Sequence, residues 1–216
     1  MYKLFLGLFL SLALVVNGQS VSASADKMNV LYIGVDNPVT IAASGLSSDE
    51  VFVTLSGGGG ATIEGSGSKY IVRPTQQTYS GQFCNIDVFN TKTNQKIASF
   101  PFRVKRIPDP QAQIGGKTDG KITEGEMKVQ GGVVAVLQNF DFDAKCEIIS
   151  YTMVSTPFQA EPSVPITVSG ARFDGKVSAL IQQAKPGTVY QFYDIKCKCP
   201  GDSAGRKLNG ITLTIK

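Results

Sequence analysis

The sequence of 216 residues contains no histidine. Histidine is the usual general base near neutral pH and a frequent zinc ligand, so its absence excludes Ser-His-Asp and Cys-His catalysis and most catalytic zinc sites. Charged residues are also scarce, at 18% of the chain, and the net charge is only +4. Arg103, Lys105 and Arg106 lie close together, but a solvated strand face accounts for them. We therefore expect no nucleic-acid partner.

Long apolar runs are absent after the N-terminal stretch. Leu4–Val16 is largely apolar, follows Lys3, and is shorter than the roughly 20 residues that span a bilayer. Ala23-Ser24-Ala25 supplies the small residues of a cleavage site. We predict a cleaved signal peptide over residues 1–25, with a cut after Gly18 as the alternative site and an uncleaved anchor as the alternative interpretation. No membrane span is expected after cleavage.

The rest of the chain has the composition of an all-β protein. Gly occurs 23 times, and Val, Ile, Thr, Tyr and Phe recur between turn-forming residues. About seven strand-like segments before Lys105 predict a first β-sandwich domain over residues 26–106. Residues 107–115 are predicted to be a Pro-rich linker, with Pro108, Asp109 and Pro110 at the domain junction, because proline stiffens the backbone and removes donors.

A second β-sandwich domain is predicted over residues 116–216. One short helix is expected in it, because Val177, Leu180, Ile181 and Ala184 follow helical spacing, Asp174 can cap the helix and Pro186-Gly187 can end it. The predicted strands of this domain are Met127–Phe140, Lys145–Val154, Ile166–Ser169, Thr188–Lys198 and the C-terminal segment from Ile211.

Three groups of residues are candidates for functional sites. Asp141 and Asp143 share one face if Phe140–Asp143 is a strand, at a separation that would suit a glycosidase pair. Alternation of core and solvent residues explains them better, so no catalytic residue is predicted. The Gly57–Gly60 run lacks the Lys-Ser/Thr pair of a phosphate-binding loop and is interpreted as a hairpin tip. Four tyrosines are candidates for a binding surface if exposed, with packing as the default: Tyr79, Tyr151, Tyr190 and Tyr193.

The cysteines are Cys84, Cys146, Cys197 and Cys199. Export permits disulfides, and Cys197 and Cys199 share a strand face. A disulfide between Cys146 and either Cys197 or Cys199 is therefore a candidate. A metal site made of these three thiolates is the rival interpretation, and no metal or other cofactor is predicted.

Several segments together resemble one protein family. They are Asn29-Val-Leu-Tyr-Ile-Gly-Val-Asp-Asn-Pro-Val-Thr-Ile-Ala42, Phe102-Arg-Val-Lys-Arg-Ile-Pro-Asp-Pro110, Phe140-Asp-Phe-Asp143, Asp194-Ile-Lys196, Pro200-Gly201, Arg206-Lys-Leu208 and Ile211-Thr-Leu213. In this order they are similar to the C-terminal periplasmic half of the shaft protein of gliding motility and type IX secretion, the GldM/PorM family of Bacteroidetes. The Tyr-Ile-Gly-Val-Asp-Asn-Pro and Arg-Val-Lys-x-Ile-Pro-Asp-Pro motifs are its most specific parts.

The resemblance implies two tandem immunoglobulin-like sandwiches that form a dimer and contact ring components of the secretion system. The resemblance implies that family members join a proton-driven motor through an N-terminal membrane helix, and in its place we expect a cleavable signal in this chain. We therefore expect a non-enzymatic periplasmic module that docks on envelope proteins, with a homodimer as one expected state. The alternatives are a secreted or surface adhesin-like β-sandwich protein unrelated to secretion and, third, a glycan-cleaving enzyme built on the Asp141 and Asp143 pair.

Overall fold

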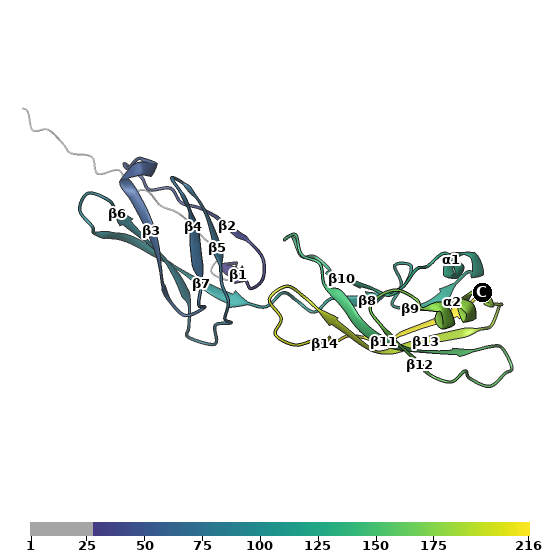
Figure 1. Cartoon of the computed structure of the whole chain (residues 1–216). Coiled ribbons are helices and arrows are strands. Elements are labelled where there is room, and N and C mark those ends of the chain that lie inside the picture. Colours follow the sequence, from purple (N-terminus) through teal and green to yellow (C-terminus); the bar gives the residue numbers. More distant parts are fainter. Residues whose placement is uncertain (1–27) are drawn as a thin grey trace, which may run out of the picture.

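The computed structural model describes residues 28–216 and shows two β-rich lobes arranged end to end (Figure 1). The first lobe contains strands β1–β7 and the second contains β8–β15. Each lobe has its own cluster of buried apolar side chains. The predicted all-β class with two tandem sandwiches is confirmed. The predicted signal peptide lies outside the described residues.

The first domain is a sandwich of a four-stranded and a three-stranded sheet. The order is β1-β7-β6-β3 in one sheet and β2-β5-β4 in the other. β1 runs parallel to the end of β7, and the other pairs are antiparallel. The strands are β1 (Val30–Tyr32), β2 (Asn37–Thr40), β3 (Val51–Gly57), β4 (Thr62–Ser66), β5 (Lys69–Arg73), β6 (Cys84–Asn90) and β7 (Lys96–Lys105), with the short 3-10 helix η1 (Ser48–Glu50) before β3.

The core of this domain follows from strand alternation. In β6, Cys84, Ile86 and Val88 point inward because side chains two apart share a face. The Gly57–Gly60 run does not form a hairpin tip, because β3 pairs with β6 whereas β4 pairs with β5 in the opposite sheet. The run crosses between the sheets, and Gly59 is buried there, where an added Cβ would press on Val104 and Cys84.

The second domain is built on a sheet of order β12-β11-β13-β15-β9, with β14 paired to β13 and a separate pair of β10 and β8. β9 joins β15 in parallel, and the other pairs are antiparallel. The strands are β8 (Gln111–Gln113), β9 (Asp119–Ile122), β10 (Val134–Val136), β11 (Glu147–Thr156), β12 (Ile166–Ser169), β13 (Val189–Lys198), β14 (Arg206–Lys207) and β15 (Ile211–Ile215).

The predicted helix is α2 (Gly175–Gln182), and the Asp174 carboxylate accepts a hydrogen bond from the Val177 N–H at its start. A further helical turn, α1 (Glu124–Lys128), replaces the beginning of the strand expected over Met127–Phe140. Thr123 and Glu126 form a reciprocal capping box there, which favours a helix over a strand. Only the short β10 remains of that expected strand.

A bulge in β13 decides which residues of the strand enter the core. Asp194 has a φ of +48°, and the pairing with β11 shifts register at this point. Tyr190 and Phe192 point inward before the bulge, whereas Ile195 and Cys197 point inward after it. Uniform alternation, which would put Ile195 on the face opposite Tyr190, is therefore wrong beyond Asp194. No helix within residues 28–216 is both long enough and apolar enough to cross a bilayer.

Candidate functional site: the joint between the two domains

The segment after β7 connects the domains and is at the same time part of the second core. Ile107 is 2% exposed, Pro110 is buried, and Ala112 and Ile114 are fully buried in the second apolar cluster. β8 within this segment pairs with β10. The residues predicted as a linker are therefore held firmly against the second domain.

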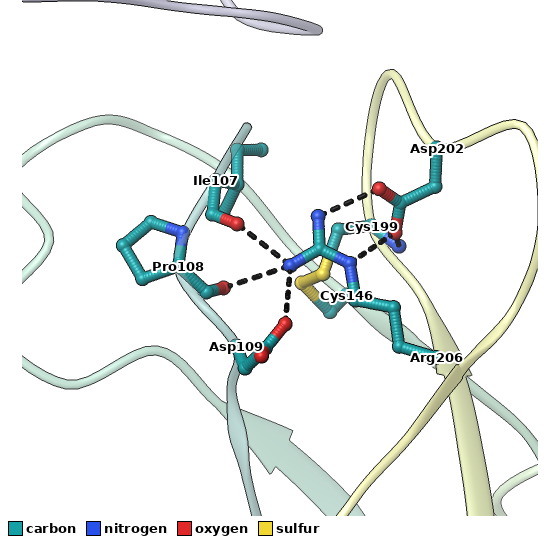
Figure 2. Close-up of a disulfide and its surroundings, with 7 residues drawn as sticks. All are labelled: Ile107, Pro108, Asp109, Cys146, Cys199, Asp202 and Arg206. Carbon is teal, nitrogen blue, oxygen red and sulfur yellow. Dashed lines mark hydrogen bonds and ion pairs between the residues drawn. A yellow bond between two sulfur atoms is a disulfide. The ribbon is translucent and has the colours of Figure 1, made fainter. Parts of the chain in front are cut away.

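Arg206 is the side chain that fixes this segment (Figure 2). Its Nη1 donates hydrogen bonds to the carbonyl oxygens of Ile107 at 2.6 Å and Pro108 at 3.2 Å, and to the Asp109 carboxylate at 2.8 Å. Its Nε and Nη2 donate to both oxygens of Asp202, at 2.7 and 2.6 Å. The planar guanidinium suits this two-sided arrangement, because its donors lie in one fixed fork.

The Asp202–Arg206 pair is a buried ion pair, since their side chains are 2% and 7% exposed. Burial alone would raise the pKa of Asp202, but hydrogen bonds from Arg206 and from the Cys199 N–H outweigh burial and hold that pKa below its ordinary value. Burial opposes the charge of Arg206 as well, and the two aspartates outweigh it and raise the guanidinium pKa. Both groups are charged in the folded protein at neutral pH.

A disulfide between Cys146 and Cys199 lies beside this ion pair (Figure 2). Cys199 begins a tight turn in which its N–H donates to the Asp202 carboxylate, and the Asp202 N–H donates back to the Cys199 carbonyl. Gly201 has a φ of +78°, which glycine adopts without strain. The disulfide thus ties the turn after Cys199 to the loop that precedes Cys146.

The first domain contributes a turn between β1 and β2 whose shape depends on Asn37. This side chain is 2% exposed. Its Oδ1 accepts from the Tyr32 N–H at 2.7 Å, and its Nδ2 donates to the carbonyls of Tyr32, Val35 and Val72. These hydrogen bonds hold the backbone of Ile33–Asp36 in one conformation.

The two turns meet in close backbone contact. Gly34 has a φ of +85°, and an added Cβ would lie 2.5 Å from the Gly201 nitrogen and still closer to the Pro200 carbonyl. A Cβ on Gly201 would in turn lie 2.7 Å from Ile33 Cγ2. Only glycine at both positions permits this approach.

Aromatic side chains form a second contact across the boundary. The Tyr32 ring packs edge-on against Phe140, with centroids 4.9 Å apart, and against Phe142 at 5.2 Å. Val35 also packs against the second apolar cluster. We call this whole contact the joint: residues 32–37, 107–110, 140–142 and 199–206.

The predicted pair Asp141 and Asp143 lies at the edge of the joint. Asp141 and Asp143 are exposed in a loop rather than on a strand. The neighbouring Phe140 and Phe142 each contact the Tyr32 ring. The strand interpretation of these four residues is wrong, because the contacts with the first domain rather than pleating determine their direction.

The remaining cysteines and tyrosines divide by burial. Cys84 and Cys197 carry buried free thiols, and burial raises the pKa of both. Tyr151 and Tyr190 are fully buried, whereas Tyr79 is 71% exposed. Within residues 28–216, no group of three or more His, Cys, Asp or Glu side chains is placed to hold a metal ion.

Sequence reasoning did not predict Arg206, Asp202, Gly34 or Asn37 as parts of one site. Two signals were available: Arg206 follows the turn-forming segment 200–205, and Asp36-Asn37-Pro38 is a turn sequence. Neither pattern reveals a partner that is distant in the sequence. The joint fixes the position of one domain relative to the other.

The fold and this site define a class of protein: a tandem β-sandwich whose two domains are held in a fixed relative position by contacts at the joint. Two family models match the chain: one described as GldM third domain matches residues 20–105, and one described as GldM C-terminal domain matches residues 108–216. The chain belongs to the GldM family, which confirms the resemblance found in the sequence. It is therefore a component related to gliding motility and type IX secretion, and associated with the cell envelope.

No curated protein matches the sequence. Among solved structures, one match is described as "Protocadherin gammaB7 EC3-6 cis-dimer structure", with 12% identity and a TM-score of 0.22. The match covers 84% of this chain and 50% of the protocadherin chain, so this chain spans about half the length of the solved structure that it matches. A similarity this low carries no information about function.

Proposed function

We propose that this chain is a non-enzymatic binding and structural module of the gliding-motility and type IX secretion machinery, located in the periplasm and docked on envelope proteins. The observation that carries the proposal is the pairing of two successive GldM domains through a joint locked by Arg206. A module of this kind presents surfaces at a fixed relative orientation, which favours simultaneous contact with large partners.

The joint supports a semi-rigid rod rather than two loosely linked domains. Loose linkers are exposed and rich in polar, Gly or Pro residues, and few contacts cross them. Here Ile107 is buried and two glycines bring the backbones of the two domains together. The proposed partners are ring components of the secretion system, and a homodimer is the proposed assembly state.

Localisation and co-purification test this function. The chain carrying a C-terminal tag would be expressed in its native cells, the cells fractionated, and the tagged protein purified after cross-linking. We expect the protein in the periplasmic fraction, without residues 1–25, together with type IX ring components. A chain found in the culture medium or at the cell surface without them would support the secreted adhesin alternative and overturn the proposal.

A variant of the joint makes this test specific. Gly34→Ala should reduce recovery of the ring components, because an added Cβ would press on the Pro200-Gly201 backbone and docking of a semi-rigid module depends on the angle between its domains. The matched variant Gly45→Ala, whose added Cβ would have no neighbour within 4 Å, should leave recovery unchanged. Light scattering of the purified protein tests the homodimer separately, and a monomer mass would remove that part of the proposal.

A further inference from the structure

A cleft of about 890 Å³ lies beside the joint. A loop of the first domain, the end of β7 and the connecting segment form its walls. We call it the junction cleft, and its lining residues are Gln77–Phe83, Arg103, Lys105, Arg106, Ile107, Pro108 and Asp109. The basic group at 103–106, interpreted from the sequence as a solvated strand face, and Tyr79, for which packing was the default, therefore lie in the same cleft.

The charge of the cleft is positive. Lys105 and Arg106 are exposed, and neither forms an ion pair with another residue of the described range 28–216. Asp109 is the one acidic residue of the lining, and it shares Arg206 with Asp202. Arg103, Lys105 and Arg106 outnumber it, so the lining itself carries excess positive charge. Such a surface attracts acidic groups of a ligand, because a concave site lined by charges of one sign concentrates their electric field.

Two aromatic side chains stand beside these cations. Tyr79 is 71% exposed and Phe83 is 40% exposed. Their loop is held against β7, because the Thr78 N–H donates to the Val104 carbonyl and the Val104 N–H donates to Thr78 Oγ1. Exposed rings on an anchored loop are typical of protein interfaces, where aromatic and Arg residues are enriched.

The wall made by the connecting segment is fixed from the other side. Arg206 binds the carbonyls of Ile107 and Pro108 and the carboxylate of Asp109, all three of which line the cleft. The position of Lys105 and Arg106, directly before this segment, is therefore set by the joint. A preformed cleft loses less conformational entropy when a ligand binds.

We propose that the junction cleft binds an acidic, extended segment of a protein partner, with its carboxylates on Lys105 and Arg106 and its apolar side chains on Tyr79 and Phe83. This rests on the proposed function and names the docking surface and the chemistry of the partner. A concave cleft with both cations and aromatic rings suits a peptide with acidic and apolar side chains. An anionic lipid surface would instead need a flat or convex basic face.

Photo-cross-linking in the native cells tests the proposal on the full chain. The photoreactive residue p-benzoylphenylalanine would replace exposed Ser80 in the cleft or exposed Glu161 in the second domain, and mass spectrometry would identify the cross-linked molecule. We expect the Ser80 position to capture a peptide segment enriched in Asp and Glu. Capture of lipid or glycan, or of a segment without acidic residues, would overturn the proposal.

Charge reversal supplies the matched comparison. Lys105→Glu with Arg106→Glu should lower the yield of the Ser80 cross-link by about tenfold or more, because like charges across an interface repel. Lys69→Glu with Lys176→Glu changes the net charge equally at exposed positions outside the cleft and should leave the yield unchanged. Equal yields from both double variants would overturn the proposal.

The outcome also separates this proposal from the proposed function. If the Glu161 position cross-links to ring components and the Ser80 position captures nothing, docking occurs through another surface and only the cleft is rejected. If neither position captures an envelope protein and the tagged chain is found outside the cells, both proposals fail.

Discussion

Replacing Arg206 by Met is the sharpest perturbation of the joint. Met has a similar length and is apolar, so it fills space without supplying a donor. The change removes the hydrogen bonds to Ile107, Pro108 and Asp109 and leaves the Asp202 carboxylate, 2% exposed, without its counter-charge. Loss of one partner from a buried ion pair typically costs about 3–5 kcal/mol of folding free energy. We expect a loss of that size.

A second substitution distinguishes electrostatics from simple loss of packing. Asp202→Asn removes the orphaned charge, and its side-chain oxygen can still accept from the Cys199 N–H. The double variant Arg206→Met with Asp202→Asn should therefore be more stable than Arg206→Met alone, by about 1–3 kcal/mol. A cost due to packing alone would make the double variant no more stable than the single one.

The pH dependence follows from the direction of the Asp202 pKa. In the natural protein this pKa is lowered, so its stabilisation is fully present above the unfolded value of about 3.9 and is lost as pH falls through the folded pKa. In Arg206→Met, burial without the guanidinium raises the folded pKa above the unfolded one. The penalty is then relieved as pH falls, and the stability difference between the two proteins should shrink from pH 7 toward pH 4.

Urea-induced unfolding followed by circular dichroism measures these differences, since the chain has no Trp to report by fluorescence. Amide hydrogen exchange in β13 assigns the loss to the second domain. Exposed Lys176→Met is the control and should change stability by less than about 0.5 kcal/mol. A loss below about 1 kcal/mol in Arg206→Met, or a stability difference that grows at lower pH, would refute the reasoning.

Three further predictions concern the joint and its surroundings. Gly34→Ala should open the angle between the domains, which small-angle X-ray scattering measures. Gly45→Ala is the control, because Gly45 also has a positive φ but has no neighbour within 4 Å of an added Cβ. Equal scattering profiles for the two variants would contradict the contact between Gly34 and the Pro200-Gly201 backbone. Replacing Cys146 and Cys199 by serine should lower the free energy of unfolding, measured in urea, by about 4 kcal/mol. This value is the chain-entropy estimate for a separation of 53 residues, and a loss near zero would contradict a structural role of the disulfide. Asp141→Asn with Asp143→Asn should change stability by less than about 0.5 kcal/mol, and a larger change would assign these exposed carboxylates a role that the loop does not suggest.

Strand positions were the most predictable part of the fold. β12 begins and ends where the sequence pattern placed it, and α2 lies where helical spacing and its caps predicted. In both segments the buried residues follow the period of the element, Val168 in β12 and Val177 and Ile181 in α2, so periodicity reports burial directly. α1 was missed because a single helical turn has no periodicity, although the Thr123–Glu126 capping box was visible.

Pairing and register were harder to predict, because they depend on residues distant in sequence. The bulge at Asp194 reverses the faces of β13, and nothing local marks a non-Gly residue with positive φ. The Gly57–Gly60 run looked like a hairpin tip because strand content alone does not show that two neighbouring strands belong to different sheets.

The candidate site shows the same limit more clearly. Pro108 and Asp109 were predicted as a junction, but their partner Arg206 is almost 100 positions away, with a separation of 97 from Asp109. The burial of Arg206 and its partners cannot be inferred from a two-residue strand such as β14, which has no readable periodicity. The sequence pattern therefore marks Pro108 and Asp109 as candidates for the junction, and it does not reveal the hydrogen bonds of Arg206 that hold this segment.

Five of the seven segments that carried the family resemblance contribute residues to the joint, whereas Asp194–Lys196 and Ile211–Leu213 lie in β13 and β15 of the second domain. The Ile33–Asp36 turn, the Ile107–Asp109 segment, Pro200-Gly201 and Arg206 all belong to the joint. Residues needed only for packing within one domain would have no reason to gather at the boundary. Their convergence argues that the relative position of the two domains is a property on which function depends. If docking required only one domain, a variant with an opened joint would bind partners as well as the natural chain does, and the recovery experiment with Gly34→Ala decides between these cases.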